Sequence, residues 1–196
     1  MPTLTEMHSL SNRMKITVSP EKLEKLSQNQ VGFYMKYASF VLRTLGRPSF
    51  LKFLCWMLRR ENIEEHKIRD VQVRVFPLRK ENGRGLAGNC NTERGEIQIY
   101  PKTLNFCQGL MQESGKDKFV LYAGSRARAA LIHELLHLKY ADNEDKVREL
   151  TEEYFAVFTQ NRSAQDSQTP NIYDMLFKAK TIENPLKHVD QVCASY

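Results

Sequence analysis

A helical run with two histidines and a glutamate constrains this chain more than any other feature. The run reads AALIHELLHLKY over residues 129–140 and sets His133, Glu134 and His137 among alanine, leucine and isoleucine side chains. Residues four apart project from the same face of a helix, so both imidazoles can reach one metal ion. Polar groups in a mostly apolar helix cost free energy unless a metal or other partners satisfy them. The pattern therefore predicts a buried helix that carries a zinc site.

Glu134 has a separate place in this pattern. It directly follows the first histidine, so it lies beside the metal and not on it. Zinc activates a water molecule and polarises a substrate carbonyl, and a neighbouring carboxylate can move the proton of that water to a leaving amine. We therefore expect a zinc metalloendopeptidase with one Zn²⁺ per chain, a peptide or protein substrate, and Glu134 as the general base.

A catalytic zinc needs a third protein ligand and one open position. The other histidines, His8, His66 and His188, are remote in sequence. Tyr140 and Asn143 stand where the HExxHxxGxxH pattern requires Gly and His. The candidates are therefore carboxylates on the helix that follows the motif. They are Glu144, Glu149, Glu152 and Glu153.

HELLH followed by ELTEEYFA resembles the gluzincins, zinc peptidases whose third ligand is a glutamate on the following helix. The short gap after the motif is similar to that of the minigluzincins, and the Phe-Ala pair is similar to one in ImmA/IrrE-like helices. Aligning Phe155 and Ala156 with that pair implies Glu149 as the third ligand and Glu153 as a carboxylate supporting a ligating histidine. By the same resemblance, the strand 95–100 is the edge strand that pairs with an extended substrate.

Several alternatives remain open around this assignment. Thr151 and Glu152 replace the usual Glu-Ala of the gluzincin helix, so Glu152 and Glu153 are alternative ligands. Asp142 is a second candidate to support a histidine. The apolar stripe of the helix leaves Glu149, Glu152 and Glu153 off its centre. The stripe consists of Val147, Leu150, Thr151, Tyr154 and Phe158.

Two further roles have candidates but no decisive pattern. A peptidase of this type needs a donor for the tetrahedral oxyanion. The candidates are Tyr140, His188, Arg126 and Arg128. Cys90, or the C-terminal tail with Cys193, could occupy the open zinc position and hold the enzyme latent.

Periodicity predicts an α+β fold, a zincin-like domain in which a small antiparallel sheet packs on the motif helix and a glutamate helix follows. Helices are expected over 20–28, 31–45, 49–60, 103–111, 119–140 and 144–160, with a further apolar patch at 172–177. Strands are expected at 71–75 and on both sides of a turn at 92–95. Four segments follow from this reading. They are a weakly ordered N-terminus (1–19), a helical segment (20–66), the metallopeptidase domain (67–160) and a tail (161–196) that docks back or inhibits.

Composition adds a rival hypothesis. Residues 1–80 hold fifteen Lys and Arg against seven Asp and Glu, within a net charge of +6 for all 196 residues. A basic half is typical of proteins that bind nucleic acid, so one alternative is a nucleic-acid-associated regulator whose zinc site cleaves a repressor or is structural only. The sequence contains no apolar run long enough for a membrane span and no secretory signal, so we expect a cytoplasmic protein without a membrane partner.

Overall fold

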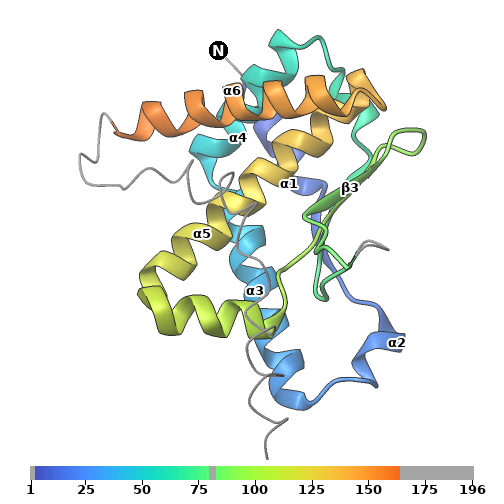
Figure 1. Ribbon diagram of the computed structural model, residues 1–196. Coiled ribbons are helices and arrows are strands. Elements are labelled where there is room, and N and C mark those ends of the chain that lie inside the picture. The colour runs from blue at the N-terminus through green and yellow to red at the C-terminus, as the bar shows by residue number, and fades with distance from the viewer. Residues whose placement is uncertain (1–2, 80–82, 164–196) are drawn as a thin grey trace, which may run out of the picture.

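The α+β class is confirmed by the computed structural model, which describes residues 3–79 and 83–163 (Figure 1). Helices and one four-stranded sheet build a single connected apolar core. The helices are α1 (Leu4–Asn12), α2 (Pro20–Leu23), α3 (Gln28–Leu45), α4 (Pro48–Arg60), α5 (Leu104–Tyr140) and α6 (Glu144–Ser163), with a 3₁₀ turn at Glu65–Lys67. The strands are β1 (Met14–Thr17), β2 (Asp70–Arg74), β3 (Gly88–Asn91) and β4 (Glu96–Ile99).

The sheet is mixed, and this corrects the expectation of an antiparallel one. Its order is β1-β2-β4-β3, with β1, β2 and β4 parallel and only β3 antiparallel to its neighbour β4. The hairpin β3–β4 is the antiparallel pair that the turn at 92–95 predicts, and Gly95 takes a positive φ of 64° in that turn. Parallel pairing joins strands that are distant in the chain, which a local pattern does not reveal.

Strand β4 is an inner strand, so it cannot be the edge strand expected at 95–100. It pairs with β2 on one side and with β3 on the other, and its backbone groups are engaged by both. Strand β3, the hairpin partner of β4, is the outermost strand on this side of the sheet. A peptide could extend the sheet at β3 and not at β4, because only an edge strand has unpaired N–H and C=O groups.

Residues 4–17 are ordered, contrary to the expectation of a weakly ordered N-terminus. Thr3 and Glu6 form a capping box at the start of α1, and the signature T-x-x-E is readable in the sequence. Leu10 is fully buried and Met14 nearly so, and α1 packs against α4. Burial of these side chains, together with the pairing of β1 with β2, outweighs the modest apolar content of the segment.

Helix α5 carries the histidine motif and changes direction once along its length (Figure 1). Gly115 is non-helical, with φ 84° and ψ 164°, and separates a first rod from the long second rod that ends at Tyr140. This break lies between the two helices expected at 103–111 and 119–140. Almost every residue from Ala123 to Leu136 is buried, because the second rod lies between the sheet, α3 and α6.

Helix α6 returns along α5, and its predicted apolar stripe is confirmed. Val147, Leu150, Thr151, Tyr154 and Phe158 are all buried. The helical segment 20–66 contributes to the same core through α3 and α4. The expected tail and the apolar patch at 172–177 lie outside the described residues, apart from the last turn of α6. No helix within the described ranges is long and apolar enough to cross a membrane.

Candidate metal centre

The two histidines of the motif meet on one face of α5. Their Nε2 atoms lie 3.2 Å apart, and their rings meet edge to face with centroids 4.8 Å apart. Both side chains are largely buried, with 22% of His133 and 16% of His137 exposed. This is the arrangement expected from i, i+4 spacing on a helix.

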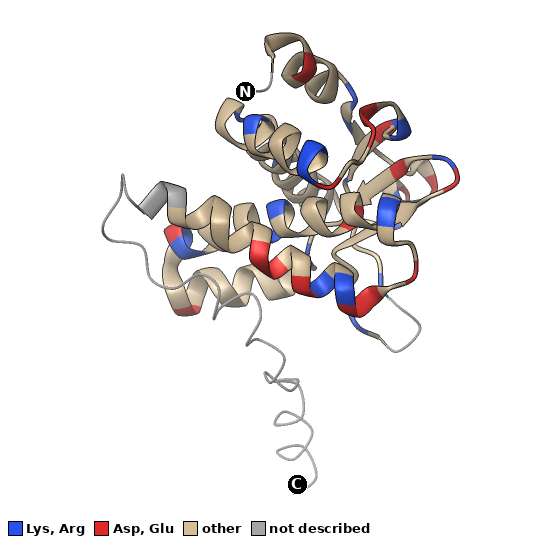
Figure 2. Ribbon diagram, turned by 90° about the horizontal axis from the view of Figure 1, so that it is seen from above, with Lys and Arg blue, Asp and Glu red and all other residues tan. Residues whose placement is uncertain are grey.

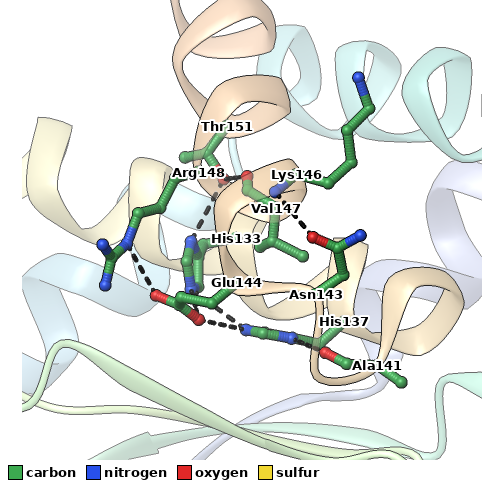
Figure 3. Close-up of polar contacts among 9 residues, drawn as sticks. All are labelled: His133, His137, Ala141, Asn143, Glu144, Lys146, Val147, Arg148 and Thr151. Atoms are coloured by element: carbon green, nitrogen blue, oxygen red, sulfur yellow. Dashed lines mark hydrogen bonds and ion pairs between the residues drawn. The ribbon is translucent and has the colours of Figure 1, made fainter.

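Glu144 completes a group of three possible ligands (Figure 3). Its Oε2 lies 3.7 Å from Nε2 of His133 and 3.5 Å from Nε2 of His137. Its other oxygen, Oε1, accepts a hydrogen bond from Nε of Arg148 at 2.9 Å. The chain reverses direction only a few residues after His137, so the first residue of α6 lies opposite the last turn of α5.

The hydrogen bond that each imidazole makes through Nδ1 determines which of its two ring nitrogens carries the proton. Nδ1 of His137 lies 2.5 Å from the carbonyl oxygen of Ala141, a pure acceptor, so this nitrogen carries the proton. Ala141 adopts a positive φ of 45°, and its N–H also caps the carbonyl of His137. The turn after α5 therefore holds His137 with the lone pair of Nε2 directed at Glu144.

Thr151 holds His133 in the same way. Its hydroxyl donates to the carbonyl of Val147 at 2.6 Å, so Oγ1 is left to accept from Nδ1 of His133 at 3.3 Å. The lone pair of Nε2 on His133 then also faces the group. Metal-bound histidines in proteins usually donate their second ring nitrogen to such an acceptor. Thr151, and not Asp142 or Glu153, provides the acceptor here.

Two Nε2 atoms and a carboxylate oxygen converge here, and a cation between them would interact favourably with all three. Ligand atoms 2.0–2.1 Å from a tetrahedral zinc lie about 3.3 Å from one another. The three separations in the structure, 3.2, 3.5 and 3.7 Å, are close to that value. A proton on one imidazole would satisfy the two nitrogens but would leave the carboxylate beyond hydrogen-bond distance. The donor set and its spacing therefore fit a metal ion.

Glu149, the expected third ligand, lies outside the group formed by His133, His137 and Glu144. Glu149 lies five residues after Glu144, about 140° further around the helix. Its side chain is 68% exposed, and its carboxylate pairs with Nζ of Lys146 at 3.0 Å. Glu153 is also turned away, since its carboxylate bonds to Arg60 at 3.1 Å on the surface. Neither Glu152 nor Asp142 belongs to the group.

Glu134 is buried on the strand side of α5, with 6% of the residue exposed. Its carboxylate lies against Gly88, the first residue of β3. Cys90 lies two residues further on the same strand, and burial, followed by the negative charge of Glu134, raises the pKa of its thiol to about 12. The neutral thiol is thus favoured at Cys90, and the latency hypothesis for this residue stays a prediction.

Glu61 forms a buried polar centre that the sequence analysis did not identify. It follows α4, and its carboxylate accepts hydrogen bonds from Lys139 at 3.0 Å, from the Tyr140 hydroxyl at 2.7 Å and from the Tyr154 hydroxyl. These donors come from the end of α5 and from α6. The carboxylate therefore connects α4 to α5 and α6, the two helices that carry His133, His137 and Glu144. A glutamate at the end of a basic helix gives no sign of this role in the sequence.

The candidates for an oxyanion donor have other partners. The hydroxyl of Tyr140 bonds to Glu61, and Arg126 donates to the carbonyls of Tyr100 and Leu86. Arg128 lies over the rings of Phe50 and Phe158. The remaining candidate, His188, lies outside the described residues.

No protein-family model matches the sequence, and no curated protein or solved structure is significantly similar to it. The functional interpretation therefore depends on the geometry of the centre.

Proposed function

We propose that this chain is a zinc metalloendopeptidase in which His133, His137 and Glu144 hold the metal and Glu134 is the general base. The convergence of two Nε2 lone pairs and one carboxylate oxygen carries the proposal. Two histidines and one glutamate are a ligand set of catalytic zinc sites, which keep a fourth position for water or substrate. The proposal keeps the gluzincin class of zinc peptidase. It places the ligating glutamate at Glu144, the first residue of α6, and not at Glu149 within that helix.

Each residue of the centre has a separate task. When bound, zinc acts as a Lewis acid that activates a water molecule and polarises the scissile carbonyl. Glu134 accepts the proton of the attacking water and delivers it to the amine as the carbon–nitrogen bond breaks. Thr151 and Ala141 keep both imidazoles in the tautomer that leaves Nε2 free of a proton.

Substrate binding along β3 agrees with this chemistry. Strand β3 is the outer strand of the β3–β4 hairpin and forms one edge of the sheet. At Gly88, its backbone lies against Glu134. An extended peptide that pairs with β3 would use main-chain hydrogen bonds, which are independent of side-chain sequence. The proposed substrate is therefore an extended or unfolded segment of a protein.

The nucleic-acid alternative receives little support from the distribution of charge. Lys and Arg are interspersed with Asp and Glu along the ribbon (Figure 2). Several basic residues of the N-terminal half form ion pairs with acidic residues. These pairs are Arg59–Glu6, Arg60–Glu153, Lys15–Asp70 and Arg13–Glu65. Pairing of this kind reduces the positive potential that a nucleic-acid backbone requires.

Zinc content and hydrolysis of a denatured protein substrate, measured together on wild type and Glu134→Gln, test the proposal. Wild type should bind one zinc, cleave the substrate, lose activity to a chelator and regain it with zinc. Glu134→Gln should keep the zinc and lose at least about 10²-fold in rate, as expected for removal of a general base. Glu153→Gln, a surface control, should behave as wild type. Zinc binding without hydrolysis in wild type would favour a structural site, and no zinc binding would overturn the proposal.

A further inference from the structure

A second site lies where three parallel strands end. The carboxyl ends of β1, β2 and β4 meet at the same edge of the sheet, because these strands are parallel neighbours. A cavity of about 120 Å³ is found at this edge. It is lined by Thr17, Ser19, Lys22, Arg74, Val75, Phe76, Leu78 and Tyr100. Crevices beyond the carboxyl ends of parallel strands are common ligand sites. The lining shares no residue with the metal centre.

The charge of this lining is wholly positive. Lys22 and Arg74 are both half-buried, and the wall contains no acidic residue. Among the described residues, the hydrogen-bond partners of the Arg74 side chain are neutral: the hydroxyl of Ser19 and, at 3.2 Å, the amide oxygen of Gln72. Within residues 3–79 and 83–163, neither cation forms an ion pair. Two cations at one cavity without a carboxylate attract an anion.

The shape and the remaining wall restrict the anion further. A single water needs about 10–15 Å³, so a cavity of about 120 Å³ admits a larger group. Thr17, Ser19 and Tyr100 also line the cavity and carry hydroxyls; the Ser19 hydroxyl accepts from Arg74, and the Tyr100 hydroxyl donates to Gln98. Phe76 and Leu78 add apolar side chains to the lining, and Leu78 is 37% exposed.

We propose that this cavity binds a small organic anion whose phosphate or carboxylate group contacts Lys22 and Arg74 and whose apolar part lies against Phe76 and Leu78. Arginine offers two parallel N–H donors to either oxyanion, so both chemistries fit the same residues. The site is independent of the metal centre in its residues and chemistry, and it requires no metal.

Titration of the full chain with phenyl phosphate, benzoate and inorganic phosphate, followed by amide NMR, tests this site. Amide shifts should saturate at residues 17–19 and 74–76. Phenyl phosphate or benzoate should bind more tightly than inorganic phosphate, because only these two probes carry an apolar part. The tighter of the two identifies the phosphate or the carboxylate class.

Lys22→Gln and Lys25→Gln form a matched pair for the same titration. Lys25 is exposed and does not line the cavity, whereas Lys22 does. Lys22→Gln should raise the Kd of the tighter probe at least about fivefold, since it removes one of two nearby cations. Lys25→Gln should leave that Kd unchanged. Equal effects of the two variants, or shifts that do not saturate or that fall elsewhere, would overturn the proposal.

Discussion

The carboxylate of Glu134 occupies the space beside Gly88 that any other residue's side chain would need. A β-carbon built at position 88 would lie 2.5 Å from Oε1 and 2.6 Å from Cγ of Glu134. Both distances are much shorter than a van der Waals contact. Strand β3 and helix α5 therefore approach as closely as they do only because residue 88 has no side chain. The same contact determines where the proposed general base lies.

Gly88→Ala should displace Glu134 and lower the rate of hydrolysis without removing the metal. The added methyl group must push the carboxylate or the strand away, and a displacement of about 1 Å at a catalytic group costs about 10² in rate. Zinc content should stay at the wild-type level, because the ligands lie elsewhere. The measurement is kcat/KM on a peptide substrate together with zinc content.

Gly32→Ala is the matched control for this substitution. Gly32 is exposed within α3, and a β-carbon there would have nothing within 4 Å. Alanine should keep the activity and raise helix stability by about 0.5–1 kcal/mol. Wild-type activity in Gly88→Ala would show that this contact does not position Glu134.

Local patterns predicted the features that a single helix determines. The pairing of His133 with His137, the apolar stripe of α6 and the break near Gly115 all follow from the spacing of residues within one element. The hairpin β3–β4 was predictable for the same reason, since its turn contains a glycine with positive φ.

Features that depend on how distant elements meet were not predictable in this way. A short turn after residue 140 was expected and Glu144 was one of the candidates, but the positive φ of Ala141 in that turn, and the approach of Glu144 to both histidines, were not indicated by any residue pattern. The closeness of Gly88 to Glu134 depends on the position of β3 at the edge of the sheet. The parallel pairing of β1 requires a long crossover, and its register is determined by the shared core.

Glu144→Ala and Glu149→Ala should separate the two candidates for the third ligand. Loss of Glu144 removes one of three protein ligands, and zinc Kd should rise by more than the 10–100-fold typical of supporting residues. Glu149→Ala should leave the Kd unchanged, because its carboxylate pairs with Lys146 on the surface. Competition with a chromophoric chelator measures both. The reverse order of effects would identify Glu149 as the ligand.

Thr151→Val tests whether the hydroxyl of Thr151 sets the tautomer of His133. Valine has nearly the same shape but cannot accept the proton of Nδ1, so zinc Kd should rise about 10–100-fold. Thr159→Val is a suitable control. The Thr159 hydroxyl lies 3.0 Å from each of the carbonyl oxygens of Phe155 and Ala156 in its own helix. An equal effect of the two variants on Kd would mean that general helix stability, and not the tautomer, was responsible.

Glu61→Ala should destabilise the fold, because it leaves the hydroxyls of Tyr140 and Tyr154 and the Lys139 ammonium without their acceptor. The Glu61 side chain is only 9% exposed, so the expected loss is about 3 kcal/mol in the free energy of unfolding, measured with urea at pH 7. Glu64→Ala is the control. The Glu64 side chain is 60% exposed and its carboxylate lies 3.2 Å from His66, so this substitution should change stability by less than about 0.5 kcal/mol.

The same carboxylate predicts how stability depends on pH. Burial opposes ionisation of Glu61, but hydrogen bonds from Tyr154, Tyr140 and Lys139 outweigh it and lower its pKa below the usual 4.5. A group whose pKa is lowered on folding stabilises the native state above its unfolded pKa and loses that contribution as pH falls through the folded value. The stability advantage of wild type over Glu61→Gln should therefore be constant above pH 4.5 and shrink below it. An advantage that grew on acidification would contradict an ionised Glu61 in the native protein.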